Sequence, residues 1–398
     1  MLKLQNFLIT HFPHLTFIFM NFVLIISYFV IPQEMFVNFI SSTNKYFSFN
    51  ALIFQAVCML VFILPLFINK NFFELKKFHV KDSSYDWALL FSTIASIIGY
   101  IFFYRYLLQN PEVLVYSLSE GTVSFMKSEM TDNLMPGIST MTQFGVPATI
   151  IGLIRYFNSK KIIYLFPVIA IIFLSLFRSF VFSERLAILE IIIPIFFLYI
   201  IFERRNLKKL ILAFGFLFLI IWSFELIRSY SDPYNNQYNP IYYLSVRLLS
   251  YFASSYNNFM FGVENYVIQI YAIDLIKPFL QFTTNELLNF SYRLDLLERF
   301  GTVEFNTYTF LGYLYFNFGM FTPIIVFIYS LLLRCIYHDY LKKQFIGLYL
   351  FPIFIVGILD IRIEYLLNPR TYFPYFVFLI LLFYSYIFTS NNPKVNNG

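Results

Sequence analysis

Long apolar runs separated by short charged clusters extend along the whole chain. Charge-free windows cover residues 15–31, 46–69, 87–104, 137–154, 162–177, 186–202 (interrupted by Glu190), 210–227 (interrupted by Glu225), 305–333, 345–359 and 372–389. Most are close to the roughly 20 apolar residues that a helix needs to cross a bilayer. The pattern therefore predicts an all-α polytopic membrane protein in which residues 1–398 form a single transmembrane domain. We expect about ten transmembrane helices, in a range of about 10 to 12.

The window at 305–333 is too long for one simple span. A continuous helix of 29 residues would extend about 44 Å, whereas the hydrocarbon core is roughly 30 Å thick. Asn317, Gly319 and Pro323 offer places to interrupt it. We expect a short helix, a turn near Gly319, and then the true span.

Composition agrees with this interpretation. The chain is 59% hydrophobic and only 13% charged, whereas about a quarter of the residues of a soluble domain are charged. Cys58 and Cys335 lie far apart in apolar runs, so neither a disulfide framework nor a metal-ligand spacing is predicted. No small-residue cleavage site follows the first apolar run, and we expect its helix to be a retained anchor.

Basic residues predict the orientation of the helices. With the N-terminus inside, 16 of the 28 Lys and Arg residues fall in the terminal segments and short loops on the cytoplasmic side, where basic residues are normally enriched. Both termini are then cytoplasmic, and the net charge of +6 reflects topology rather than binding of nucleic acid. Two long segments, 105–136 and the larger 228–305, fall on the outer side. Apolar stretches in the larger one, IYYLSVRLLSYF and VIQIYAIDLIKPFLQF, predict amphipathic helices on the membrane surface or capping the bundle.

Arginine and lysine are distributed differently between the two sides. The outer side holds nine Arg and three Lys, whereas the cytoplasmic side holds four Arg and twelve Lys. Guanidinium groups bind phosphate and carboxylate through paired hydrogen bonds, so the outer arginines predict a clamp for a lipid-linked pyrophosphate. The alternative is that they pair with neighbouring carboxylates or extend to lipid phosphates. The candidates near membrane boundaries or in the larger loop are Arg178, Arg185, Arg228, Arg247, Arg362 and Arg370.

Carboxylates are the remaining candidates for acid–base chemistry. All four histidines lie on or near the predicted cytoplasmic side, so an outer general base would have to be Glu184, Glu304, Asp360 or Glu364, or no strong base is used. Glu190 is expected within the membrane, where a carboxylate is costly and usually pairs with a cation. No metal-ligand cluster and no phosphate-binding glycine-rich loop is found. We therefore expect no cofactor and no metal, with energy supplied by an activated substrate or an ion gradient.

Two stretches carry a resemblance to a known family. FRSFVFSERLAILEIIIPIFFLYII (177–201) is similar to an arginine-containing outer turn followed by an apolar helix. FNTYTFLGYLYFNFGMFTPIIVFIYSLLL (305–333) is similar to an Asn/Thr-rich entry after a large loop, followed by a Phe-Gly break. With the overall plan, these stretches resemble the O-antigen polymerases, the Wzy-type oligosaccharide repeat-unit polymerases. Asn306 and Tyr308, in the second stretch, join the arginines as expected glycan or pyrophosphate contacts.

The resemblance implies a glycosyltransferase of the bacterial inner membrane whose active site faces the periplasm, with 228–305 as a large periplasmic loop and 105–136 as a second periplasmic segment. Its substrate would be an undecaprenyl-pyrophosphate-linked oligosaccharide, and its partners the lipid bilayer and a chain-length regulator protein. A flippase for the same lipid-linked repeat unit and an O-antigen ligase remain alternatives. A membrane acyltransferase is disfavoured because His11 and His14 lack a suitable surrounding motif.

Overall fold

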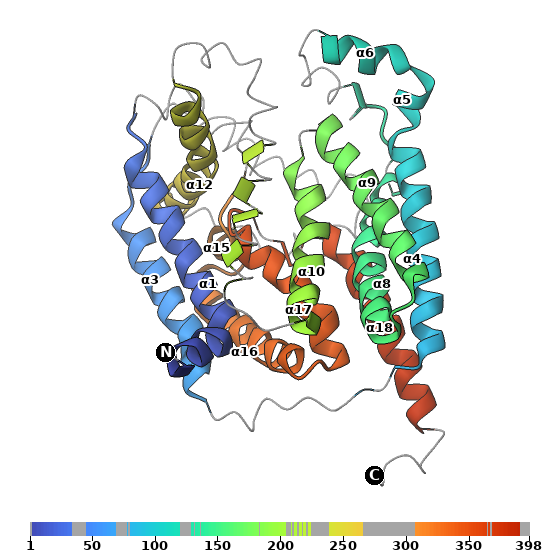
Figure 1. Ribbon diagram of the computed structural model, residues 1–398. Helices are drawn as coiled ribbons and strands as arrows, with labels where there is room; N and C mark the ends of the chain where they lie inside the picture. The colour runs from blue at the N-terminus through green and yellow to red at the C-terminus, as the bar shows by residue number, and fades with distance from the viewer. Residues whose placement is uncertain are drawn as a thin grey trace, which may run out of the picture. The chain divides into compact units, whose positions relative to one another are not determined.

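The structure is a computed structural model of the 398-residue chain (Figure 1). It describes residues 2–33, 45–68, 80–119, 129–135 without 131, 137–203 without 183, 239–265, and 307–390 without 364 and 367, together with residue 78 and isolated positions between 208 and 223. Every regular element in these ranges is a helix. Most of the predicted seventh helix, 210–227, and most of the loop 228–305 lie outside the described residues.

Six of the described helical segments are long and apolar enough to cross a membrane. They are Ile9–Val30, Phe49–Phe67, Asp82–Phe103, Ile162–Val181, Arg185–Glu203 and Phe310–Leu341, and the shorter apolar helices are Phe345–Leu359 and Arg370–Ser385. Large apolar side chains such as Trp87, Phe166 and Phe173 point outward from these helices. Such extensive apolar exposure is expected where lipid is the solvent. The chain is an all-helical membrane protein.

The chain divides into two compact units. Unit 1 comprises residues 1–73, 238–334 and 357–369, and unit 2 comprises 74–237, 335–356 and 370–398. Unit 1 contains α1 (Leu2–Val30), α3 (Phe49–Ile63) with the 3₁₀ turn η1 (Leu64–Phe67), α12 (Pro240–Glu264), α15 (Phe310–Phe318), η6 (Gly319–Phe321) and the first part of α16 (Thr322–Leu341).

Side-chain caps define where three of the helices in unit 1 begin. Ser48 accepts a hydrogen bond from the Ala51 amide at the start of α3, and Asn239 accepts one from Ile241 at the start of α12. Thr309 accepts one from Gly312 at the start of α15. Each cap satisfies a backbone donor that has no partner within the helix, which matters more where water is scarce.

Helix α12 lies within the predicted large loop and is packed into unit 1. It contacts α1, α3 and α15, and Tyr243, Tyr256 and Phe259 on it are fully buried. Its polar residues are satisfied by distant partners, since Asn257 Oδ1 accepts from the Tyr46 amide at 2.7 Å and Asn258 donates to the Thr307 carbonyl at 3.0 Å. The stretch IYYLSVRLLSYF thus begins a helix of the core of unit 1.

The predicted interruption at Gly319 is confirmed. Helix α15 ends at Phe318, and Gly319 adopts φ 54° and ψ −130° before η6 and α16 begin. This backbone conformation is accessible essentially only to glycine. Thr322 Oγ1 donates to the Gly319 carbonyl at 2.8 Å and so fixes the entry into α16.

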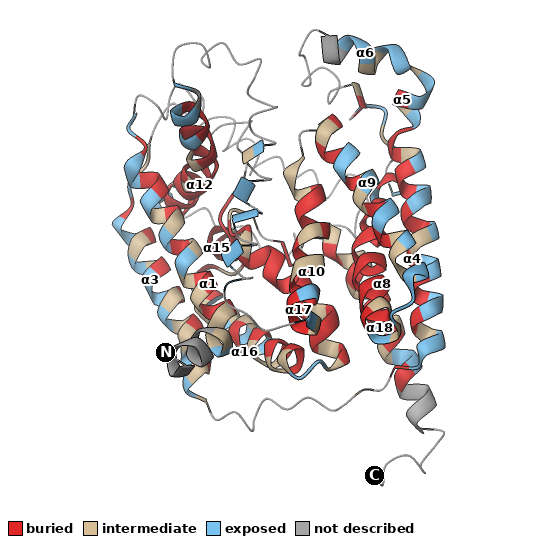
Figure 2. Cartoon of the chain, viewed as in Figure 1, coloured by how far each residue is buried: buried red, intermediate tan, exposed pale blue. Residues whose placement is uncertain are grey.

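Unit 2 is built around α8. It contains α4 (Asp82–Phe103), α5 (Arg105–Gln109), α6 (Pro111–Ser119), η3 (Ser139–Phe144), α8 (Gly145–Ser159), η4 (Ile162–Tyr164), α9 (Leu165–Phe182) and α10 (Arg185–Glu203). It also holds most of α17 (Phe345–Leu359), and α18 (Pro369–Ser390) from Arg370 onward. Figure 2 shows α8 buried along most of its length, and α4, α9 and α10 pack around it. The predicted span 137–154 begins later than expected, because residues 139–144 form a 3₁₀ turn.

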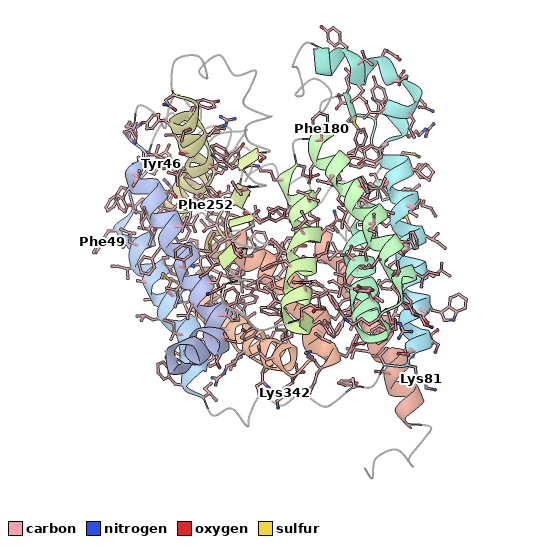
Figure 3. All side chains as sticks on the ribbon, viewed as in Figure 1. Tyr46, Phe49, Lys81, Phe180, Phe252 and Lys342 are labelled. Atoms are coloured by element: carbon pink, nitrogen blue, oxygen red, sulfur yellow. The ribbon has the colours of Figure 1, made fainter. Side chains whose placement is uncertain are left out.

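Several lysines and Arg155 gather at one end of unit 2. At one end, Arg155 of α8 pairs with Asp82 and Asp86 of α4 at 2.6 and 2.8 Å, and Lys160 pairs with Glu203 of α10 at 3.5 Å. Lys343 lies over the Phe202 ring at this end. Figure 3 shows Lys81 and Lys342 toward this end and Phe180 toward the other. The C-terminus of α9, which carries Phe180, therefore lies at the end opposite to these lysines.

Candidate anion-binding site

Arg178 anchors a buried ionic network at the C-terminal end of α9. Its Nε and Nη2 atoms contact Glu184 Oε2 at 3.0 and 2.9 Å, and Nη1 donates to Thr142 Oγ1 at 2.7 Å. The guanidinium also lies over the Phe103 ring, 4.6 Å from its centroid. The residue is only 8% exposed. Arg178 is therefore held on two edges by hydrogen bonds and on one face by an aromatic ring.

Arg370, at the start of α18, approaches the same carboxylate from another element. Its Nη2 atom pairs with Glu184 Oε1, and Nη1 donates to Glu190 Oε1 at 3.2 Å. Glu190 is buried within α10, and the expected pairing of this carboxylate with an arginine is confirmed. The Arg370 side chain is 24% exposed, compared with 10% for Arg178. Arg370 is thus the more accessible of the two cations.

The four charged groups balance one another. Two guanidiniums and two carboxylates meet where α9, α10 and α18 have their ends, and Glu184 bridges both arginines through its two oxygens. Buried charges persist when paired and hydrogen-bonded in this way. Both Glu184 oxygens are occupied by guanidinium donors, so its geometry suits a group that orients the arginines better than a proton acceptor.

A second group of predicted residues lies in unit 1. Arg362 contacts both oxygens of Asp360 at 2.7 and 2.9 Å, and its guanidinium lies 5.4 and 5.5 Å from the Tyr251 and Phe252 ring centroids. Arg247 lies 5.9 Å from the same Tyr251 ring. Phe252, labelled in Figure 3, belongs to α12. This combination of guanidinium, carboxylate and aromatic side chains is chemically suited to a sugar or a phosphate.

The remaining predicted residues are placed less informatively. Arg185 is the first residue of α10 and is half-buried. Tyr308 is buried with its ring edge-on to Phe316, 4.5 Å between centroids, which is a packing role. Arg228, Glu304 and Asn306 lie outside the described residues, as does Glu364.

Lys45 lies in the segment before α3. Its Nζ donates to the Ile31 carbonyl at 2.7 Å and lies 4.6 Å from the Tyr28 ring centroid, and partial burial lowers the pKa of its ammonium group. These contacts hold Lys45 against the C-terminal end of α1. Within the described part of the chain, no group of three or more His, Cys, Asp or Glu residues is arranged to hold a metal ion.

Sequence reasoning missed the neutral residues that contact these arginines within each of the two units. Thr142 and Phe103 contact Arg178 from η3 and α4, and Tyr251 contacts Arg362 from α12. A threonine and a phenylalanine in apolar runs carry no signal of this role, since 55 phenylalanines are present. Only the tertiary contacts identify them.

Comparisons with known proteins do not assign a function to the chain. No family model, no curated protein and no solved structure matches the chain.

Proposed function

We propose that the protein is a membrane glycosyltransferase that joins undecaprenyl-pyrophosphate-linked oligosaccharide repeat units into a polysaccharide. The observation that carries the proposal is the ionic network of Arg178, Arg370, Glu184 and Glu190 at helix ends. The pyrophosphate of such a lipid lies at the membrane surface, the depth at which transmembrane helices end. Guanidinium groups are well suited to bind it because they donate paired hydrogen bonds to phosphate oxygens.

The proposed topology has about ten helices, both termini in the cytoplasm and the larger loop in the periplasm. It is supported by the distribution of lysines in unit 2, where Lys160, Lys342 and Lys343 lie toward one end and Phe180, near Arg178 on α9, lies toward the other. The network would then face the periplasm of the inner membrane.

The proposed reaction transfers a glycan between two lipid-linked molecules. The bond between the anomeric carbon and the pyrophosphate oxygen breaks, and an acceptor sugar hydroxyl bonds to that carbon. The hydroxyl proton passes to a carboxylate, and undecaprenyl pyrophosphate leaves with the bonding electron pair. Negative charge grows on the leaving group, so positioned guanidiniums stabilise the transition state more than the ground state. Glu304 is the proposed proton acceptor, because both oxygens of Asp360, like those of Glu184, already accept hydrogen bonds from guanidiniums.

Deletion of the gene in a lipopolysaccharide-producing host tests this function. We expect single repeat units on the lipid core and no long chains, seen as the loss of the ladder on a gel. Complementation with Arg370→Ala or Arg370→Lys should leave single repeats, because one ammonium cannot replace the bidentate fork. Loss of every repeat unit on deletion would instead indicate a flippase or a ligase. Normal long chains after deletion would contradict the polymerase, flippase and ligase functions alike.

A further inference from the structure

Helix α4 makes an unusually close approach to the turn that holds Arg178. A Cβ atom built on Gly99 would lie 2.3 Å from the Thr142 amide nitrogen and 2.6 Å from the Met141 carbonyl carbon. Both are backbone atoms that cannot rotate away. Ser96, on the same face, lies with its Oγ 3.4 Å from the Thr142 carbonyl. The absence of a side chain at position 99 therefore sets the position of η3.

The same face of α4 also holds α9. Tyr100 and Ser175 share a hydrogen bond of 2.7 Å, and Tyr104 donates to the Leu174 carbonyl at 2.7 Å. Phe103 supplies the ring beneath Arg178. Contacts from Ser96 to Tyr104, on one face of α4 and its C-terminal end, thus hold both the helix that carries Arg178 and the turn that carries Thr142.

We infer that Gly99 and Thr142 are positioning residues for the anion site, acting through Arg178 and Glu184 on Arg370. Thr142 fixes Nη1 of Arg178, the opposite edge of Arg178 fixes Glu184 Oε2, and Glu184 Oε1 pairs with Arg370. In this arrangement Arg178 is a buried anchor and Arg370 is the cation that meets the ligand. The inference rests on the proposed function only for the identity of the ligand.

Two buried threonines offer a matched pair of substitutions. Thr142→Val removes the acceptor of Arg178 and keeps the side-chain shape. Thr149→Val makes the same change on α8, where the buried Thr149 hydroxyl has no hydrogen-bond partner. Gly99→Ala has a similar control in Gly215→Ala, since a Cβ at Gly215 meets nothing within 4 Å.

The first measurement needs no substrate. The purified protein in detergent is treated with phenylglyoxal, and the modification rate of Arg370 is followed by peptide mass spectrometry. We expect Thr142→Val and Gly99→Ala to raise this rate about tenfold, the scale of one lost hydrogen bond to a charged group. Thr142→Ser, which keeps the hydroxyl, should restore the wild-type rate, and Thr149→Val and Gly215→Ala should not change it. An Arg370 rate in Thr142→Val equal to that in Thr149→Val would overturn the inference.

The second measurement separates the inference from the proposed function. The same variants are introduced into the deletion host and the glycan ladder is recorded beside the amount of inserted protein. Faster Arg370 labelling with shortened chains supports both proposals. Faster labelling with an unchanged ladder keeps the positioning role and contradicts the role of this site in polymerisation. If the Thr142→Val protein is lost from the membrane, the Gly99→Ala variant is measured instead. If both proteins are lost, Thr142 has a folding role and the inference is overturned.

Discussion

At the scale of single residues, the ion pairs of Arg155 are asymmetric. The Arg155 side chain is 6% exposed, whereas those of Asp82 and Asp86 are 82% and 45% exposed. A carboxylate that loses this partner can be solvated by water. A guanidinium that loses both carboxylates remains charged where water hardly reaches it, which is the costlier outcome.

This asymmetry predicts unequal effects on stability. Asp82→Asn alone should lower the free energy of unfolding by less than about 1 kcal/mol, because Asp86 still pairs with Arg155. The double variant Asp82→Asn with Asp86→Asn should cost about 3 kcal/mol, since the buried cation is then uncompensated. Thermal unfolding in detergent measures the difference, with the exposed Asp132→Asn as control. A double variant no less stable than Asp82→Asn would contradict a supporting role for these pairs.

At the scale of elements, the charge-free windows predict most described helices well. The window at 345–359 coincides with α17, and those at 87–104, 162–177, 186–202 and 372–389 fall mainly within α4, α9, α10 and α18. For α12 the sequence predicts only an amphipathic stretch on the membrane surface or capping the bundle. Its polar residues Asn257 and Asn258 can be buried because they form hydrogen bonds with Tyr46 and Thr307. Sequence alone does not show which residues so far apart in the chain will form hydrogen bonds.

The break between α15 and α16 gives a prediction for one element. At φ 54° and ψ −130°, an alanine at position 319 is strained by about 1–3 kcal/mol. Gly319→Ala should therefore lower the thermal midpoint in detergent or shift the break, whereas Gly215→Ala should have little effect. Proteolysis of the variant, compared with the wild type, reports a shifted break as a changed cleavage pattern near residue 319. Unchanged stability and cleavage would show that the turn tolerates a side chain.

At the scale of the whole molecule, the sequence indicates the charged residues of the site and the pairing of Glu190 with a cation, but not which cation pairs with it. Arg178, Glu184, Glu190 and Arg370 were noted because of their charge at predicted helix ends or within a span. Glu190 and Arg370 are 180 positions apart, and no periodicity links residues at that separation. The helix packing that brings α18 to α10 is set by the fit of many apolar side chains, which composition does not encode.

The gathering of lysines at one end of unit 2 predicts that its two ends are accessible from opposite sides of the membrane. Leu108 on α5 is 70% exposed and belongs to the segment predicted to be periplasmic, next to the end of α9 through the cluster of Tyr104, Leu107 and Val181. Lys342, after α16, is exposed and belongs to the basic end.

Single cysteines at these positions test the orientation directly. With Cys58 and Cys335 replaced by serine, an impermeant maleimide should label Leu108→Cys in intact spheroplasts and Lys342→Cys only after permeabilisation. The positive-inside distribution of lysine is the physical reason for this direction. The reverse pattern would place the Arg178 network on the cytoplasmic side, which would contradict the proposed periplasmic site and with it the proposed function. Labelling of both cysteines from the same side would contradict the assignment of the two ends of unit 2 to opposite membrane surfaces.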